Sequence, residues 1–72
     1  MHTPVPGIYR HYKGNLYEVC GVARHSETGD PLVVYRALYG DYGLWVRPAE
    51  MFQESVIHEG EAQPRFALVK AF

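Results

Sequence analysis

The sequence contains a single cysteine, Cys20, among its 72 residues. One cysteine leaves no partner for an internal disulfide, and a thiolate zinc site would need ligands from elsewhere. Disulfide-stapled scaffolds and cysteine-rich zinc modules are therefore excluded. We expect the chain to fold in a reducing compartment.

Long apolar runs are missing as well. No stretch of about 18 consecutive apolar residues occurs, so the sequence predicts no membrane-spanning helix and no membrane partner. Residues 1–7 have neither a basic start nor an apolar run, so we expect no secretory signal. Together these absences predict a cytoplasmic protein.

The sequence also lacks an excess of either charge. Seven Lys and Arg are balanced by eight Asp and Glu, which gives a net charge of −1. Nonspecific nucleic-acid binders carry a strongly basic surface, so the balance argues against that class. We expect one domain over residues 1–72, with its core at about 7–70. A chain this small buries only roughly 60% of its unfolded surface, which excludes an active-site cleft between domains.

Aromatic residues, by contrast, are plentiful: six tyrosines, three phenylalanines and one tryptophan. One small core has little room for so many large side chains. We therefore expect some of them to line a surface.

Short runs of apolar and β-prone residues, bounded by glycine and proline, predict strands rather than amphipathic helices. The expected strands cover residues 7–12, 16–25, 32–39, 44–47 and 65–69. Turns at 13–15, 26–31 and 40–43 separate them, because turn-favouring residues gather there. The range 53–64 predicts a loop, with a short strand over 55–58 as the alternative.

The second expected strand contains a glycine in its middle, Gly21. Glycine at such a position predicts a bulge or bend, as a small barrel requires where one strand serves two sides. Regular alternation places the following residues on one face: Tyr17, Val19, Gly21 and Ala23.

Pro48 ends the fourth strand and favours a tight helical turn over 48–52, which we expect to place Met51 and Phe52 on the core. About five short antiparallel strands and one helical turn predict an all-β fold, a small SH3-like barrel. An OB-like barrel ranks second, since it usually has a longer chain and a helix between strands.

Several segments also resemble a known family. They are Gly7-Ile8-Tyr9-Arg10-His11-Tyr12-Lys13-Gly14, His25-Ser26-Glu27-Thr28, Val33-Val34-Tyr35, Leu38-Tyr39-Gly40, and Trp45-Val46-Arg47-Pro48 with Met51-Phe52. In this order they resemble the small bacterial domain-of-unknown-function family 1653, over residues 7 to about 66. The resemblance implies an SH3-like barrel with no established activity. The loop around Asp30 departs from the family pattern, so no role is assigned to that residue.

Polar and aromatic residues of these segments form the candidate ligand-binding set. Arginine offers a planar fork for carboxylate or phosphate, and tyrosine and tryptophan offer flat faces for stacking. The candidates are Tyr9, Arg10, His11, His25, Glu27, Tyr35, Trp45 and Arg47. The alternative is that the aromatics only fill the core, with Arg10 and Arg47 paired to Glu27 or Glu18.

Catalytic and metal sites have weaker support. His25-Ser26-Glu27 holds the residue types of a triad, but consecutive residues of an extended chain point to opposite sides. A metal site from His11, His25 and Glu27 matches no zinc spacing. We therefore predict no catalytic residues, no metal ligands and no cofactor.

The sequence thus predicts a non-catalytic binding module whose partner is a small planar or anionic ligand, a peptide or a nucleotide. Two alternatives stay open. One is a structural protein that self-associates through a barrel edge as a weak homo-oligomer. The other is a small hydrolase or transferase using His25, Glu27 or Cys20.

Overall fold

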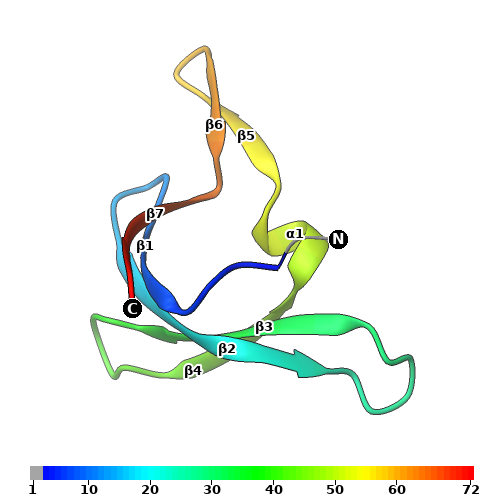
Figure 1. Ribbon diagram of the computed structural model, residues 1–72. Coiled ribbons are helices and arrows are strands. Elements are labelled where there is room, and N and C mark those ends of the chain that lie inside the picture. The colour runs from blue at the N-terminus through cyan, green and yellow to red at the C-terminus, as the bar shows by residue number, and fades with distance from the viewer. Residues whose placement is uncertain (1–2) are drawn as a thin grey trace.

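Antiparallel pairing joins five strands into one sheet in the order β4-β3-β2-β1-β7, and a separate hairpin pairs β5 with β6. The computed structural model describes residues 3–72. The strands are β1 (Gly7–His11), β2 (Leu16–Arg24), β3 (Pro31–Ala37), β4 (Leu44–Pro48), β5 (Ser55–His58), β6 (Glu61–Pro64) and β7 (Phe66–Ala71), and the helix is α1 (Ala49–Phe52). The sheet curls round an interior (Figure 1), which confirms the predicted small SH3-like barrel.

The last strand returns to the first, because β7 pairs with β1 from His11↔Phe66 to Gly7↔Ala71. The predicted closing strand at 65–69 is thus confirmed, with its end two residues later. At the other side of the sheet, β4 pairs only with β3. No ladder joins β4 to β7 within residues 3–72, so the barrel is open between these two edges.

A bulge interrupts β2, where the register with β3 shifts between Val19 and Gly21. This confirms the predicted irregularity at Gly21. The extra residue reverses the alternation that follows, so that Val22 lies opposite the buried Val33. The expectation that Gly21 and Ala23 share the face of Val19 is therefore wrong.

Aromatic side chains fill most of the core. The rings of Phe52 and Phe66 stack with centroids 4.1 Å apart and planes 2° from parallel. Tyr9 and Tyr35 meet Phe52 edge-on, with centroids at 5.6 and 5.5 Å. Aromatic pairs of this geometry add about 0.5–1.5 kcal/mol to what burial alone contributes. The core is completed by Val19, Val33 and Ala49.

The helix α1 carries Phe52 into this core. Pro48 precedes it with φ −52°, a backbone angle that suits the start of a helical turn. The predicted turn is confirmed, but the prediction that Met51 also packs on the core is wrong, because Met51 is 46% exposed and Phe52 only 1%. Successive helical side chains point about 100° apart, so one short turn presents only one of the two inward. No helix among residues 3–72 is long and apolar enough to cross a membrane.

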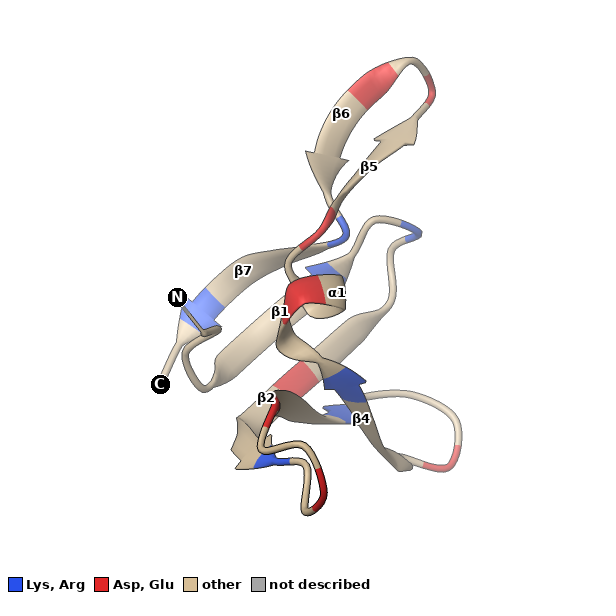
Figure 2. Cartoon of the chain, turned by 90° about the vertical axis from the view of Figure 1, so that its right-hand side faces the viewer, with Lys and Arg blue, Asp and Glu red and all other residues tan. Residues whose placement is uncertain are grey.

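Residues 53–64 form a hairpin rather than the predicted loop. The alternative strand over 55–58 is present as β5, and β6 pairs with it from His58↔Glu61 to Ser55↔Pro64. The connection has positive φ at both positions, 53° at Glu59 and 81° at Gly60, as tight two-residue hairpins require. This hairpin stands away from the curved sheet (Figures 1 and 2).

Phe52→Ala should lower the free energy of unfolding by about 3–5 kcal/mol, because it removes one ring of the central stack and leaves a cavity. Met51→Ala is the matched control on the same turn and should change stability by no more than about 0.5 kcal/mol. Urea unfolding followed by tryptophan fluorescence measures both. Equal losses in the two variants would contradict the described packing.

Candidate functional site

The inner face of the sheet carries polar side chains beside the aromatic core. Directly opposed residues of antiparallel strands point to the same face. Arg47 lies opposite the buried Val33, and Trp45 lies opposite the buried Tyr35. Both residues of β4 therefore belong to the inner face. His11 reaches the same face from β1, since its ring contacts the ring of a core residue, Phe66, at 5.0 Å.

Tyr17 joins the aromatic and polar parts of this face. Its ring packs edge-on against Tyr35 and Phe66, with centroids 5.5 and 5.4 Å away. Its hydroxyl oxygen lies 2.6 Å from that of Tyr39. Burial first, and then the hydrogen bond with Tyr39, raises the pKa of Tyr17 to about 12. Tyr17 therefore keeps a neutral hydroxyl throughout the physiological range.

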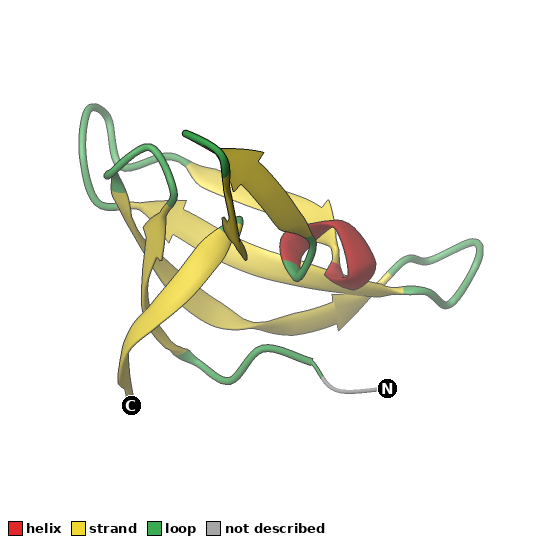
Figure 3. Cartoon of the chain, turned by 90° about the horizontal axis from the view of Figure 1, so that it is seen from above, coloured by secondary structure: helices red, strands yellow, loops and turns green. Residues whose placement is uncertain are grey.

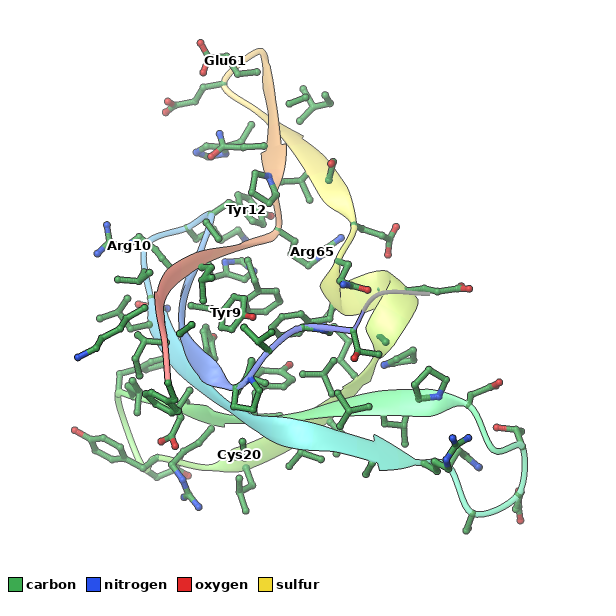
Figure 4. The ribbon with its side chains drawn as sticks, in the orientation of Figure 1. Tyr9, Arg10, Tyr12, Cys20, Glu61 and Arg65 are labelled. Atoms are coloured by element: carbon green, nitrogen blue, oxygen red, sulfur yellow. The ribbon has the colours of Figure 1, made fainter. Side chains whose placement is uncertain are left out.

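Arg65 enters the site from the junction between β6 and β7. Its backbone N–H donates to the carbonyl of Glu54, and its carbonyl accepts from the N–H of Tyr12, both at 2.9 Å. Figure 4 shows its side chain lying inside the open barrel, between the base of β6 and α1, whereas Arg10 points away from the molecule. Figure 2 shows the basic positions on β4 and at this junction.

Arg47 and Arg65 share one unusual feature. The Nε atom of each is buried and lacks a hydrogen-bond partner within residues 3–72. In the same part of the chain no arginine lies within 4.0 Å of a carboxylate. The alternative in which Arg10 and Arg47 are paired to Glu27 or Glu18 is therefore wrong. A buried donor without a partner destabilises a fold by about 1–3 kcal/mol.

His11 completes this group. Its Nδ1 accepts a hydrogen bond of 3.2 Å from the N–H of Lys13, so the neutral ring carries its proton on Nε2. Burial, followed by the charges of Arg65, Lys13 and Arg47, lowers the pKa of His11. Both arginines thus lie close enough to act on one imidazole. We refer to His11, Arg47 and Arg65 as the cationic patch.

Not all of the predicted site residues join the patch. Tyr9 is buried and its hydroxyl donates to the carbonyl of Val5 at 2.8 Å, while Arg10 faces outward. His25 and Glu27 lie in the exposed loop between β2 and β3, where Nδ1 of His25 accepts from the N–H of Glu27 at 3.1 Å. The nine residues of β2, roughly 26 Å of strand, separate this loop from the turn after His11.

The residues considered for hydrolysis do not converge. Cys20 is exposed at the bulge of β2, with its Sγ 3.9 Å from the carbonyl of Glu18, whereas His25 and Glu27 lie beyond the end of that strand. Within residues 3–72 no three His, Cys, Asp or Glu side chains gather as metal ligands would. His11 and His25 therefore do not form the metal site that was considered.

The cationic patch is half-buried and lies apart from three hollows of the described surface. These hollows, of 150, 360 and 430 Å³, are not lined by His11, Arg47 or Arg65.

The comparisons with known proteins agree with this architecture. The family model described as a protein of unknown function, DUF1653, matches residues 7–68. The chain belongs to the DUF1653 family. A crystal structure of a DUF1653 protein from Bordetella bronchiseptica is 42% identical, with a TM-score of 0.85, and the match covers 93% of this chain and 88% of that one. No curated protein matches the chain.

Three residues of the site in this DUF1653 chain are not among the candidates that the sequence predicts: Tyr17, Tyr39 and Arg65. Tyr17 and Tyr39 were placed on strands, but nothing local to either tyrosine indicates that their hydroxyls meet across 22 positions. The available signal for Arg65 was its place at the start of the closing strand.

Tyr39→Phe should lower the pKa of Tyr17 from about 12, because it removes the hydroxyl partner, yet leave it above 10 since burial remains the larger cause. A raised pKa stabilises the fold fully below pH 10, and that stabilisation is lost as pH rises toward 12. NMR of the ring Cζ carbons measures the titration. A Tyr17 pKa of 10 in the unmodified chain would contradict this account.

Proposed function

We propose that this DUF1653 chain is a non-catalytic binding module that holds a carboxylate or phosphate group on its cationic patch. The observation that carries the proposal is the pair of buried, unpartnered Nε atoms of Arg47 and Arg65. Each belongs to a guanidinium that has no carboxylate within 4.0 Å among residues 3–72. An anion would offset these two unpaired charges.

The chemistry of guanidinium favours this kind of ligand. Arginine binds carboxylate and phosphate through parallel charge-assisted hydrogen bonds, which are roughly twice as strong as neutral ones. One of the two hydroxyls in the Tyr17–Tyr39 pair donates to the other, which leaves one O–H of the pair as a further donor. Trp45, which is 57% exposed on the same face, offers a flat surface for any planar or apolar part of the ligand.

Arg47→Gln and Arg65→Gln should each weaken binding of the anion at least about tenfold, because each removes one charge from the patch. Inorganic phosphate and acetate, titrated into ¹⁵N-labelled protein, report which oxyanion is preferred. Phosphate at 100 times its dissociation constant should stabilise the unmodified chain by about 2.7 kcal/mol.

Arg10→Gln is the matched control for these variants, since Arg10 lies on the outer face. It should leave the affinity unchanged while removing the same charge from the chain. An equal loss of affinity in all three variants would mean that only net charge matters, and would refute a localised site.

Anion binding should strengthen as pH falls below about 6.5. Burial, and then the charges of Arg65, Lys13 and Arg47, lower the pKa of His11. An anion that offsets these charges raises this pKa again, so binding is accompanied by proton uptake. Without ligand, a lowered pKa gives stability that is present above pH 6.5 and lost as pH falls below it. Arg65→Gln should raise the pKa of His11, as followed by NMR of the imidazole carbons. An anion affinity independent of pH between 5 and 7.5 would contradict the role of His11.

The location of this activity stays a prediction. We expect a bacterial cytoplasmic module, consistent with the single cysteine and with the Bordetella bronchiseptica relative. The hydrolase or transferase alternative lacks support, since Cys20 lies on β2 whereas His25 and Glu27 lie in the loop beyond its end.

A further inference from the structure

We propose that the free edge of β4 binds an extended acidic segment of another protein, which adds to the sheet as a sixth strand and places a carboxylate on Arg47. This inference rests on the proposed function, because Arg47 belongs to the cationic patch. It goes further in naming the ligand class and the mode of binding. Addition of a strand to a sheet edge is an established way for domains to bind peptides.

The edge of β4 has backbone groups ready for such a strand. In the β3–β4 hairpin, the N–H of Ala37 donates to the carbonyl of Gly43 at 3.0 Å. Hydrogen-bonded and non-bonded pairs alternate along antiparallel strands, so Trp45 and Arg47 bond to β3 in the observed register. The N–H and C=O groups of Leu44 and Val46 then point away from β3, along the open side of the barrel.

The side chains of β4 are equally available. Three consecutive residues, Leu44, Trp45 and Val46, are 56%, 57% and 61% exposed. Exposed apolar residues on a free edge strand are a liability unless a partner covers them. No register shift interrupts the pairing of β4 with β3, so the edge is also regular enough to template another strand.

The opposite edge of the sheet is protected in ways that β4 is not. The register of β7 against β1 shifts between Ile8 and Tyr9, which leaves Val69 as an extra residue. β7 also carries Lys70. Bulges and lysines are the usual means of blocking an edge. Of the two free edges, only that of β4 has an uninterrupted register.

Charge selects an acidic occupant. A residue of the added strand directly opposite Arg47 would point to the inner face, with its Cβ about 5 Å from that of Arg47. A carboxylate there meets a guanidinium that has no carboxylate within 4.0 Å among residues 3–72. The residue two positions away would pack on Trp45. The expected segment is therefore extended, with an acidic residue and an apolar residue spaced by two.

A second copy of this chain fits the edge less well. β4 contains no acidic residue, so antiparallel pairing with another β4 would place no carboxylate of the added strand opposite Arg47. The edge therefore suits a foreign acidic strand rather than itself.

The test uses the full chain, labelled with ¹⁵N, and the end-capped peptide acetyl-Gly-Val-Thr-Glu-Thr-Val-Gly-amide. Binding should slow hydrogen exchange of the Leu44 and Val46 amides, which become hydrogen-bonded, while those of Trp45 and Arg47 are already protected. Replacing the glutamate of the peptide by lysine should weaken binding at least tenfold. Methylating the backbone nitrogens of the peptide that face β4 should abolish it.

Val46→Pro provides the matched protein variant, because it removes an outward N–H without touching the β3–β4 ladder. It should weaken peptide binding at least tenfold and leave phosphate or acetate binding unchanged. Unchanged peptide binding by Val46→Pro, or by the methylated peptide, would overturn the strand-addition proposal while leaving the anion site intact. Loss of the glutamate preference in Arg47→Gln supports both proposals. If glutamate and lysine peptides bind equally well, the proposed carboxylate contact is wrong even if the edge is used.

Sedimentation equilibrium decides between the two occupants of the edge. The proposal expects a monomer without peptide at the concentrations used for NMR. A dimer that Val46→Pro dissociates would assign the edge to a second copy and overturn the foreign segment as its occupant.

Discussion

The stack of Phe52 on Phe66 is the contact on which the rest of this fold depends. It joins the helical turn after β4 to the first residue of β7, so it brings together the two edges of the sheet that no backbone ladder connects. In a chain of this size, large rings are an efficient way to build a core from few residues. As a result, only the Phe52–Phe66 contact closes the barrel between β4 and β7, and the barrel stays open next to this contact.

The fold was largely predictable because its signals are local. The alternation of apolar residues and the turn residues predict the ends of five strands and of the helical turn to within about two residues. Gly21 predicts the bulge in β2. Of the hairpin over 55–64, the sequence indicates only β5, as the alternative strand over 55–58, because the turn Glu59-Gly60 lacks the usual asparagine or aspartate. Met51 was misplaced because the sequence does not say which side of a single turn faces the core.

The candidate site was predictable only in part, because it depends on contacts between distant strands. His11, Trp45 and Arg47 were chosen by residue type, and the register places them on one inner face. His25 and Glu27 were chosen on the same grounds, but they lie at the far end of β2. Arg47 differs from Arg10 in that its Nε is buried without a hydrogen-bond acceptor, and the sequence alone does not show this.

The position of Arg65 has a mechanical consequence. Its main chain joins the β5–β6 hairpin to β7, and backbone hydrogen bonds hold it to Glu54 on one side and to Tyr12 on the other. This hairpin stands clear of the sheet (Figures 1 and 2) and projects over it when the molecule is seen from above (Figure 3). A displacement of the β5–β6 hairpin at this junction would therefore also displace the guanidinium of Arg65. The distance between the two guanidinium groups of the cationic patch thus depends on the position of the hairpin.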